Sequence, residues 1–219
     1  MDTPTRMPPT RIPPAQTAPA FQLIQVAQAH FPTEYGLFRI YGFEGHTGSK
    51  VEEAVVLIMG DMKDGPAPLL RIHSQCLTGD VFHSLRCDCR AQLEIALQAV
   101  SSEGRGLIIY EHQEGRGIGL MNKLRAYELQ DQGADTIEAN EQLGFESDLR
   151  NYCLPGAILK HLGILSVRLM SNNPDKVKAL EDAGIEVAER IPCVAEAHES
   201  RRSYLETKRE KMGHLFDAV

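Results

Sequence analysis

Two spacings of hydrophobic residues run along the chain, and they predict different elements. Short apolar runs indicate strands, whereas residues such as Leu93, Leu97 and Val100 share one face of a helix. The predicted strands cover residues 37–42, 54–59, 69–73, 106–110, 167–170 and 185–191. The predicted helices cover residues 91–100, 118–130, 158–162, 174–183 and 204–216. Interleaved strands and helices indicate a layered α/β domain.

The first 20 residues differ from this pattern. They contain six prolines and show no apolar periodicity, which is typical of a disordered or extended segment. We therefore expect a disordered proline-rich tail over residues 1–20 and one domain, large enough to be a catalytic domain, over residues 21–219.

Net charge and hydropathy indicate whether the protein binds nucleic acid or membranes. The formal net charge is -7, which disfavours non-specific binding to nucleic acid or to an acidic membrane, although a local basic pocket is compatible with it. No apolar run reaches the roughly 20 residues that a membrane-spanning helix needs, and the start of the chain lacks the apolar segment of a signal peptide. We expect a cytoplasmic protein that binds neither nucleic acid nor membrane.

Three of the five cysteines, Cys76, Cys87 and Cys89, lie close together in the sequence. An odd number of cysteines in a chain of this size argues against a disulfide framework, and the clustering favours a metal such as zinc. Three protein ligands would leave one position open, as in a catalytic zinc site. The alternative is a structural site with a fourth ligand, and a redox Cys-x-Cys pair is a weaker third interpretation. Candidates for that fourth ligand are His73, His83, His112 and Cys153.

A glycine-rich segment, E-H-Q-E-G-R-G-I-G-L, follows the predicted strand that ends at Tyr110. Its glycines allow a ligand to approach the backbone, the next helix offers free N–H groups to an anion, and Arg116 adds a planar cationic fork. Glu114 would repel phosphate, so it is better suited to accept hydrogen bonds from a base or a sugar. The other interpretation is an ordinary strand–helix turn with a surface arginine.

Two later segments carry further polar candidates. Asp148 and Arg150 could act as a general base and a phosphate ligand, or they could form a plain surface pair. In S-N-N-P-D-K, Ser171 and Lys176 flank a helix start and could face an anion, or the segment could simply cap its helix.

Taken together, these segments resemble the GTP cyclohydrolase II family over roughly residues 23 to 216. The resemblance is carried, in family order, by H-S-Q-C-L-T-G-D, S-L-R-C-D-C, Q-E-G-R-G-I-G-L, K-L-R-A-Y, D-T-I-E-A-N, Q-L-G-F, S-N-N-P-D-K and K-M-G-H-L. It implies an α/β/α domain with a mixed β-sheet. It also implies the conversion of GTP to 2,5-diamino-6-ribosylamino-4(3H)-pyrimidinone 5′-phosphate, formate and pyrophosphate, the first committed step of riboflavin biosynthesis.

The resemblance also assigns roles to individual positions. Cys76, Cys87 and Cys89 match the ligands of one catalytic zinc ion per subunit. Asp148 matches a proton acceptor, Arg150 a residue acting at the α-phosphate and Tyr127 a tyrosine of the active site. The positions that match GTP contacts are Arg71, Ile72, His73, Ser74, Gln75, Gln92, Glu114, Gly115, Arg116, Thr136, Ser171 and Lys176. The family further implies Mg²⁺ with the triphosphate and a homodimer.

Two positions depart from the family pattern. Gln75 stands where a glutamate is common, and Ser171 stands where a threonine is common. Both keep hydrogen-bonding capacity, so they affect details of GTP binding rather than the reaction class. Two other functions remain open at this point: a related enzyme acting on another nucleotide-like substrate, and a zinc-stabilised nucleotide-binding module without catalysis.

Overall fold

The computed structural model describes residues 20–146 and 148–195. The proline-rich segment 1–19 and the predicted helix at 204–216 lie outside the described residues. Within the described ranges, no helix combines the length and the hydropathy needed to cross a membrane.

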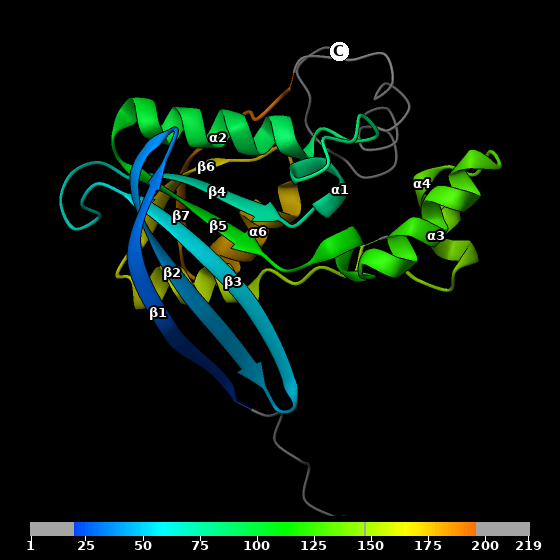
Figure 1. The fold of residues 1–219 in the computed structure, drawn as a ribbon. Coiled ribbons are helices and arrows are strands. Elements are labelled where there is room, and N and C mark those ends of the chain that lie inside the picture. Colours follow the sequence, from blue (N-terminus) through cyan, green and yellow to red (C-terminus); the bar gives the residue numbers. More distant parts are fainter. Residues whose placement is uncertain (1–19, 147, 196–219) are drawn as a thin grey trace, which may run out of the picture.

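One seven-stranded mixed sheet organises the chain, in the order β1-β2-β3-β5-β4-β6-β7 (Figure 1). Strands β1, β2, β3 and β5 pair antiparallel, whereas β5, β4, β6 and β7 pair parallel. The strands are β1 (Phe21–Thr33), β2 (Gly36–Thr47), β3 (Lys50–Met59), β4 (Leu69–Ser74), β5 (Gly106–Glu111), β6 (Ser166–Met170) and β7 (Glu186–Ile191).

Helices cover both faces of this sheet. Helix α2 (Cys89–Glu103) packs on one face, where Ala96 and Val100 meet Leu69 and Ile108. Helices α5 (Cys153–His161) and α6 (Pro174–Asp182) pack on the other face, over a larger core that includes Leu70, Ile72, Leu107 and Ile109. Adjacent residues of β4 and β5 thus point to opposite cores, as the two-residue period of a strand requires. This arrangement confirms the expected α/β/α fold with a mixed sheet.

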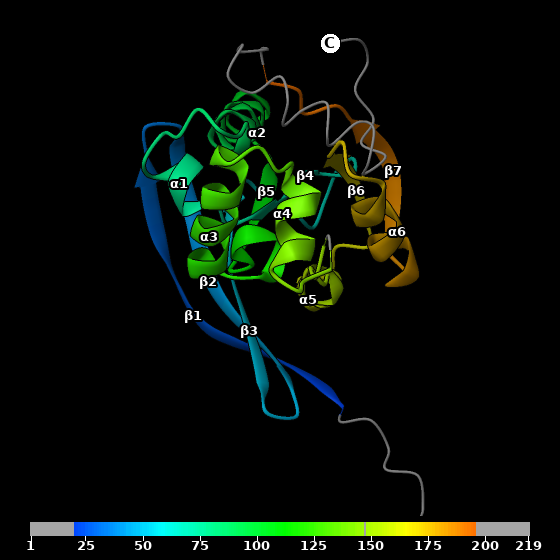
Figure 2. The same cartoon turned by 90° about the vertical axis from the view of Figure 1, so that its right-hand side faces the viewer.

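Three further helical segments lie near the carboxyl ends of β4 and β5. They are α1 (Leu77–Asp80), the 3₁₀ turn η1 (Glu114–Gly117) and α3 (Leu120–Asp131), and α3 is followed by α4 (Thr136–Gln142). Figures 1 and 2 show α3 and α4 together beyond the strand ends, away from the two layers that cover the sheet. Parallel strands in α/β proteins commonly bind ligands at this edge.

The elements predicted within the described residues are found at their places, with longer bounds in most cases, and four elements there were missed. Helix α5 begins at Cys153, whereas its predicted start was residue 158. The missed elements are β1, α1, η1 and α4. Strand β1 is an exposed edge strand whose register slips between Gln25 and Ala27, so its side-chain alternation is interrupted.

Candidate active site

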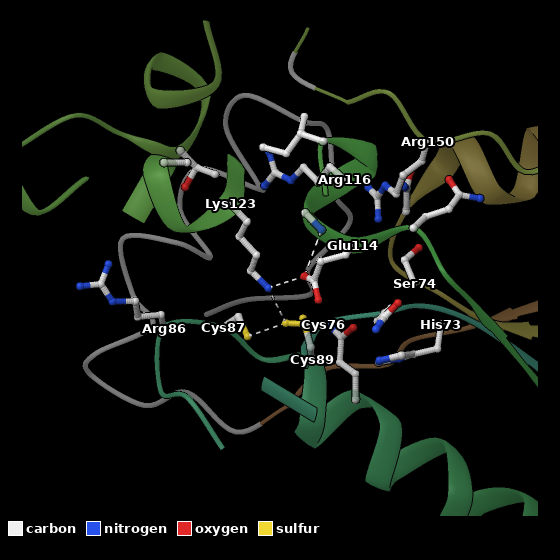
Figure 3. Close-up of a pocket in the computed structure, with 18 of the residues that line it drawn as sticks. His73, Ser74, Cys76, Arg86, Cys87, Cys89, Glu114, Arg116, Lys123 and Arg150 are labelled. Carbon is white, nitrogen blue, oxygen red and sulfur yellow. Dashed lines mark hydrogen bonds and ion pairs between the residues drawn. The ribbon is translucent and has the colours of Figure 1, made fainter. Parts of the chain in front are cut away.

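A single pocket collects most of the predicted functional residues at the carboxyl ends of β4 and β5 (Figure 3). The cysteine loop, the glycine–arginine turn, α3, α4 and the start of α6 all contribute to its walls. Six cationic side chains line the pocket, and Glu114 is the one carboxylate among its described lining residues. The cationic residues are Arg71, Arg86, Arg116, Lys123, Arg150 and Lys176.

The three clustered cysteines converge at one side of the pocket. Their sulfur atoms all lie within 4.8 Å of one another, and the Sγ atoms of Cys76 and Cys87 are 3.6 Å apart. Gly79 is required behind them, because a Cβ there would lie 2.8 Å from the Cys87 sulfur. Hydrogen bonds from the two neighbouring thiols and the charge of Lys123 hold the pKa of Cys76 well below its usual value. Three sulfur atoms this close together could hold one metal ion.

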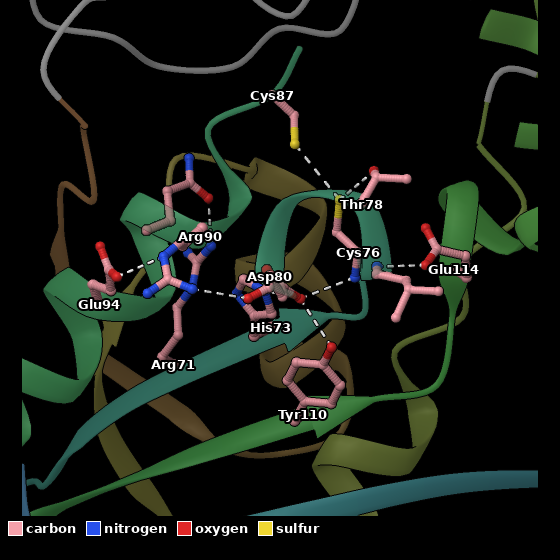
Figure 4. A network of polar contacts seen from close by, with 12 residues as sticks. Arg71, His73, Cys76, Thr78, Asp80, Cys87, Arg90, Glu94, Tyr110 and Glu114 are labelled. Atoms are coloured by element: carbon pink, nitrogen blue, oxygen red, sulfur yellow. Dashed lines mark hydrogen bonds and ion pairs between the residues drawn. The ribbon is translucent and has the colours of Figure 1, made fainter. Parts of the chain in front are cut away.

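Asp80 holds the cysteine loop in place from behind (Figure 4). Its carboxylate accepts hydrogen bonds from the Cys76 backbone N–H at 3.0 Å, the Tyr110 hydroxyl at 2.9 Å and His73 Nε2 at 3.2 Å. Burial lowers the pKa of His73, so its ring is neutral and Nε2 carries the proton given to Asp80. The other ring nitrogen, Nδ1, is therefore a buried acceptor, and it has no partner among the described residues.

Lys123 and Glu114 connect the thiols to the glycine–arginine turn. Lys123 Nζ donates to Cys76 Sγ at 3.1 Å and to Glu114 Oε1 at 2.6 Å. Glu114 Oε2 in turn accepts from the backbone N–H of Leu77, the residue after Cys76, at 2.7 Å. Burial opposes the charge of Lys123, but the Cys76 thiolate and Glu114 outweigh it and raise the pKa of the ammonium. Lys123 is therefore held as an ammonium in the pocket wall.

Arg116 presents an unpaired guanidinium to the pocket. Its two terminal nitrogens are buried and have no hydrogen-bond partner among the described residues. Its backbone adopts a left-handed φ of 59°, which is uncommon for a residue with a side chain. The turn is secured by the Leu149 N–H, which donates to the Arg116 carbonyl at 3.0 Å. Such an outlier that aims a desolvated cation into a pocket suggests a ligand-binding role.

Arg150 and Lys176 lie on the same side of the pocket as Arg116. Arg150 forms an ion pair with Asp148, and Lys176 Nζ donates to the Ile72 carbonyl at 2.8 Å. Burial raises the pKa of Asp148, but its contacts with Arg150 outweigh this and lower it overall. Asp148 is thus a carboxylate that orients Arg150.

Glu111, at the end of β5, is a buried acid close to these cations. Its side chain is fully buried, Oε1 accepts from Gln113 Nε2 at 2.9 Å, and Oε2 has no partner among the described residues. Burial raises the pKa of Glu111 to about 7, against the opposing charges of Lys176 and Arg150. No sequence pattern marks Glu111 as a functional residue.

Comparison with known proteins gives the family of the chain. The family model described as GTP cyclohydrolase II matches residues 24–192. A GTP cyclohydrolase-2 from Pseudomonas syringae pv. tomato is 56% identical over 196 residues, covering 88% of this chain and 93% of that protein. Proteins of the same name from Azotobacter vinelandii and Pseudomonas entomophila are 52% and 54% identical, covering 90% and 88% of this chain and 94% and 93% of their own lengths. This chain belongs to the GTP cyclohydrolase II family.

The residues to which the family resemblance assigned roles are brought together with two exceptions. Ile72 is fully buried in the sheet and does not line the pocket, so its nearest link to the site is its carbonyl contact with Lys176. Asp148 reaches the pocket through Arg150. The pocket walls include Arg71, His73, Ser74, Gln75, Cys76, Cys87, Cys89, Gln92, Glu114, Gly115, Arg116, Tyr127, Thr136, Arg150, Ser171 and Lys176.

None of the four candidates for a fourth metal ligand joins the thiol group in the described part of the chain. His73 contacts Asp80, His83 contacts Arg90, and His112 contacts Glu53. Cys153 is exposed at the start of α5. The thiol group therefore offers three potential metal ligands among the residues described.

Lys123 and Asp80 are the main site residues that sequence reasoning missed. Lys123 is four positions before Tyr127, so both side chains lie on one face of α3. Asp80 is four residues after Cys76 in the segment H-S-Q-C-L-T-G-D. The signal for Lys123 was therefore its helical spacing from a predicted active-site residue.

Proposed function

We propose that this chain is a zinc-dependent GTP cyclohydrolase II, converting GTP to 2,5-diamino-6-ribosylamino-4(3H)-pyrimidinone 5′-phosphate, formate and pyrophosphate in the first committed step of riboflavin biosynthesis. One observation carries the proposal: a single pocket has three convergent thiols at one side and a group of cations at the other. The products require both, since formate comes from the guanine ring and pyrophosphate from the triphosphate. Membership of the family supports the same activity.

The thiol group fits the proposed zinc ion. Two sulfur atoms bound to a tetrahedral zinc at about 2.3 Å lie roughly 3.8 Å apart, and the Cys76 and Cys87 sulfurs are 3.6 Å apart. Cys76, Cys87 and Cys89 would hold the ion and leave a fourth position for water or substrate. A zinc ion bound there would supply a Lewis acid that makes water nucleophilic near neutral pH.

At the other side, Arg116, Arg150 and Lys176 would bind the triphosphate. The unpaired guanidinium of Arg116 is the donor that gains most, because its desolvation is compensated only when an anion binds. We propose that Mg²⁺ accompanies the triphosphate on the pyrophosphate side. Arg150 is suited to stabilising charge at the α-phosphate, since a guanidinium stays protonated far above neutral pH.

Three further side chains have proposed positions in the reaction. Asp148 is the proposed proton acceptor, and its ion pair with Arg150 would keep both groups beside the phosphate. His73 Nδ1 would accept a hydrogen bond from the substrate, since Asp80 holds the proton on Nε2. Tyr127 contacts Thr78 Oγ1 at 3.2 Å and lines the thiol side of the pocket, where it would contact the base.

The test is to incubate zinc-loaded protein with GTP and Mg²⁺ and to quantify formate and pyrophosphate together. Equal release of both from GTP, with no formate from ATP, is the expected result. Pyrophosphate alone would mean that the thiol side does not perform the proposed chemistry. Neither product from a folded, zinc-containing protein would contradict the proposed activity altogether.

We also propose a cytoplasmic homodimer. The support for the dimer is the exposed edge strand β1, which contains no charged residue and exposes Phe21, Ile24 and Val26. An uncharged edge of this kind is suited to pairing with another chain. Light scattering on the purified protein would give the oligomeric state directly.

A further inference from the structure

Lys123 contacts the thiol group at the Cys76 sulfur (Figure 3), whereas Asp80 contacts the backbone N–H of the same cysteine (Figure 4). Lys123 Nζ lies 3.1 Å from Cys76 Sγ, and its side chain is only 13% exposed. In the described part of the chain, it is the one cation with a hydrogen bond to a sulfur of the three-cysteine group. The family resemblance assigned it no role.

Glu114 fixes the position of this ammonium. Both of its carboxylate oxygens are engaged by the protein: Oε1 by Lys123 at 2.6 Å and by the Gly115 N–H at 3.1 Å, and Oε2 by the Leu77 N–H at 2.7 Å. Since Leu77 follows Cys76 directly, the contacts close a ring from the thiol through Lys123 and Glu114 back to the cysteine loop. The ring ties α3, η1 and α1 together at one sulfur atom.

The proposed metal centre carries a negative charge, which the cation in this ring of contacts can compensate. Three thiolates around one divalent ion leave a net charge of about −1, and the site is poorly exposed, so a nearby cation is weakly screened. The hydrogen bond from Lys123 compensates part of that charge at Cys76. Groups that contact the ligands in this way orient them and tune the affinity for the metal.

We propose that Lys123, held by Glu114, is a positioning residue of the metal centre that compensates the Cys76 thiolate and strengthens zinc binding by the three cysteines. The inference rests on the proposed function, since it presupposes that the thiol group binds zinc. It also gives Glu114 a task at the cysteine loop, in addition to the GTP contact that the family resemblance implies.

The test measures zinc affinity in the absence of GTP, by competition with a chromogenic chelator. Lys123→Gln keeps a hydrogen-bond donor for Glu114 but removes the charge, and we expect it to bind zinc about 10 to 100-fold more weakly. Lys123→Arg keeps the charge and should retain most of the affinity. Lys178→Gln, at an exposed lysine of α6 that pairs with Asp182, is the matched control and should bind zinc like the wild type.

A second variant keeps the proposal testable if Lys123→Gln does not fold. Glu114→Gln leaves the ammonium in place but removes the carboxylate that fixes it, so it too should bind zinc more weakly than the wild type. For each variant, the thermal midpoint of the metal-free protein separates a change in folding from a change in metal binding. We expect the zinc-dependent rise in that midpoint to shrink in Lys123→Gln and Glu114→Gln.

The inference is overturned if Lys123→Gln binds zinc as tightly as the wild type. It is also overturned if Lys123→Arg loses as much affinity as Lys123→Gln, since charge would then not be the cause. A wild-type chain that binds no zinc would overturn the proposed metal site and this inference with it. Wild-type zinc binding with unchanged affinity in the variants would overturn the inference alone.

Discussion

The two sides of the pocket differ in which of their polar groups are already satisfied, and His73 Nδ1, beside Asp80, is an open acceptor on the thiol side in the described part of the chain. On the thiol side, Asp80 accepts from the Cys76 N–H, Glu114 accepts from the Leu77 N–H, and Lys123 donates to the Cys76 sulfur. On the cationic side, both terminal nitrogens of Arg116 and the Ser74 hydroxyl are buried without a partner among the described residues.

This difference shows what each side is suited to do. Hydrogen bonds hold the cysteine loop in one geometry, as a site for a small ion with fixed coordination distances requires. The cationic side instead keeps buried donors whose desolvation is compensated only by a ligand. We therefore expect mutations on the thiol side to affect ring chemistry and metal content, and mutations on the cationic side to affect GTP binding.

The largest expected effect is on the thiol side. Cys87→Ser should reduce formate release by about 100-fold or more, because Lewis-acid chemistry contributes several kcal/mol to such reactions. Pyrophosphate release should fall much less, since its cationic residues are not altered. The measurement is the ratio of the two products together with the zinc content.

Cys153→Ser is the matched control, since Cys153 is exposed at the start of α5 and lies outside the thiol group. Equal loss of both products in Cys87→Ser would mean that the two sides do not act separately. Unchanged formate release would contradict the metal assignment.

The next effect concerns the buried acid Glu111 near the cationic side. Its folded pKa of about 7 lies above the usual 4.5, so the unfolded chain releases this proton at a lower pH than the folded chain does. The contribution of Glu111 to the free energy of unfolding therefore falls as the pH rises from about 4.5 to about 7. Glu111→Gln should abolish that loss and be more stable than the wild type at pH 8 by about 3 kcal/mol.

Urea unfolding of both proteins at pH 5 and pH 8 checks this expectation. Glu128→Gln, at an exposed glutamate of α3, serves as the control and should leave the difference in stability between the two pH values unchanged. If the difference between Glu111→Gln and the wild type is the same at both pH values, Glu111 does not titrate in this range.

The smallest of these effects is expected at Arg116. Arg116→Gln should raise the KM for GTP about 10 to 100-fold, since a hydrogen bond to a charged group contributes roughly 1.5–3 kcal/mol. Zinc content should not change. Steady-state kinetics with Arg125→Gln as a control, at an exposed arginine of α3, would check it. Loss of zinc without a change in KM would contradict the assignment of metal binding to the thiol side and GTP binding to the cationic side.

Much of the fold was predictable because most core strands carry their own apolar runs. Strand β5, for example, is buried nearly throughout, and its residues 106–110 read as a strand without any knowledge of its neighbours. The exposed strand β1 was missed, since it has one paired neighbour and an interrupted register. Helix α4 was also missed, although Asp135 and Glu138 form a capping box that the sequence D-T-I-E displays.

The sequence predicted which residue types form the candidate site better than it predicted which side chains contact one another. The cysteine spacing indicated a metal site, and the order of the motifs identified the family. The resemblance placed Ile72 among the GTP contacts; the structure buries its side chain in the core, and its contact with GTP stays a prediction. Lys123 and Glu111 were not singled out, because a single lysine or glutamate in a sequence has no distinguishing pattern.

By itself, the sequence determined the fold class, the family and the residues with metal-binding and phosphate-binding chemistry, since these follow from local spacing and residue type. Only the tertiary structure decided which groups meet. The hydrogen bond from Lys123 to Cys76 joins residues 47 positions apart, and that from the Leu77 N–H to Glu114 joins residues 37 apart. Burial likewise depends on the whole fold, and burial is what raises the pKa of Glu111 and leaves Arg116 with unsatisfied donors.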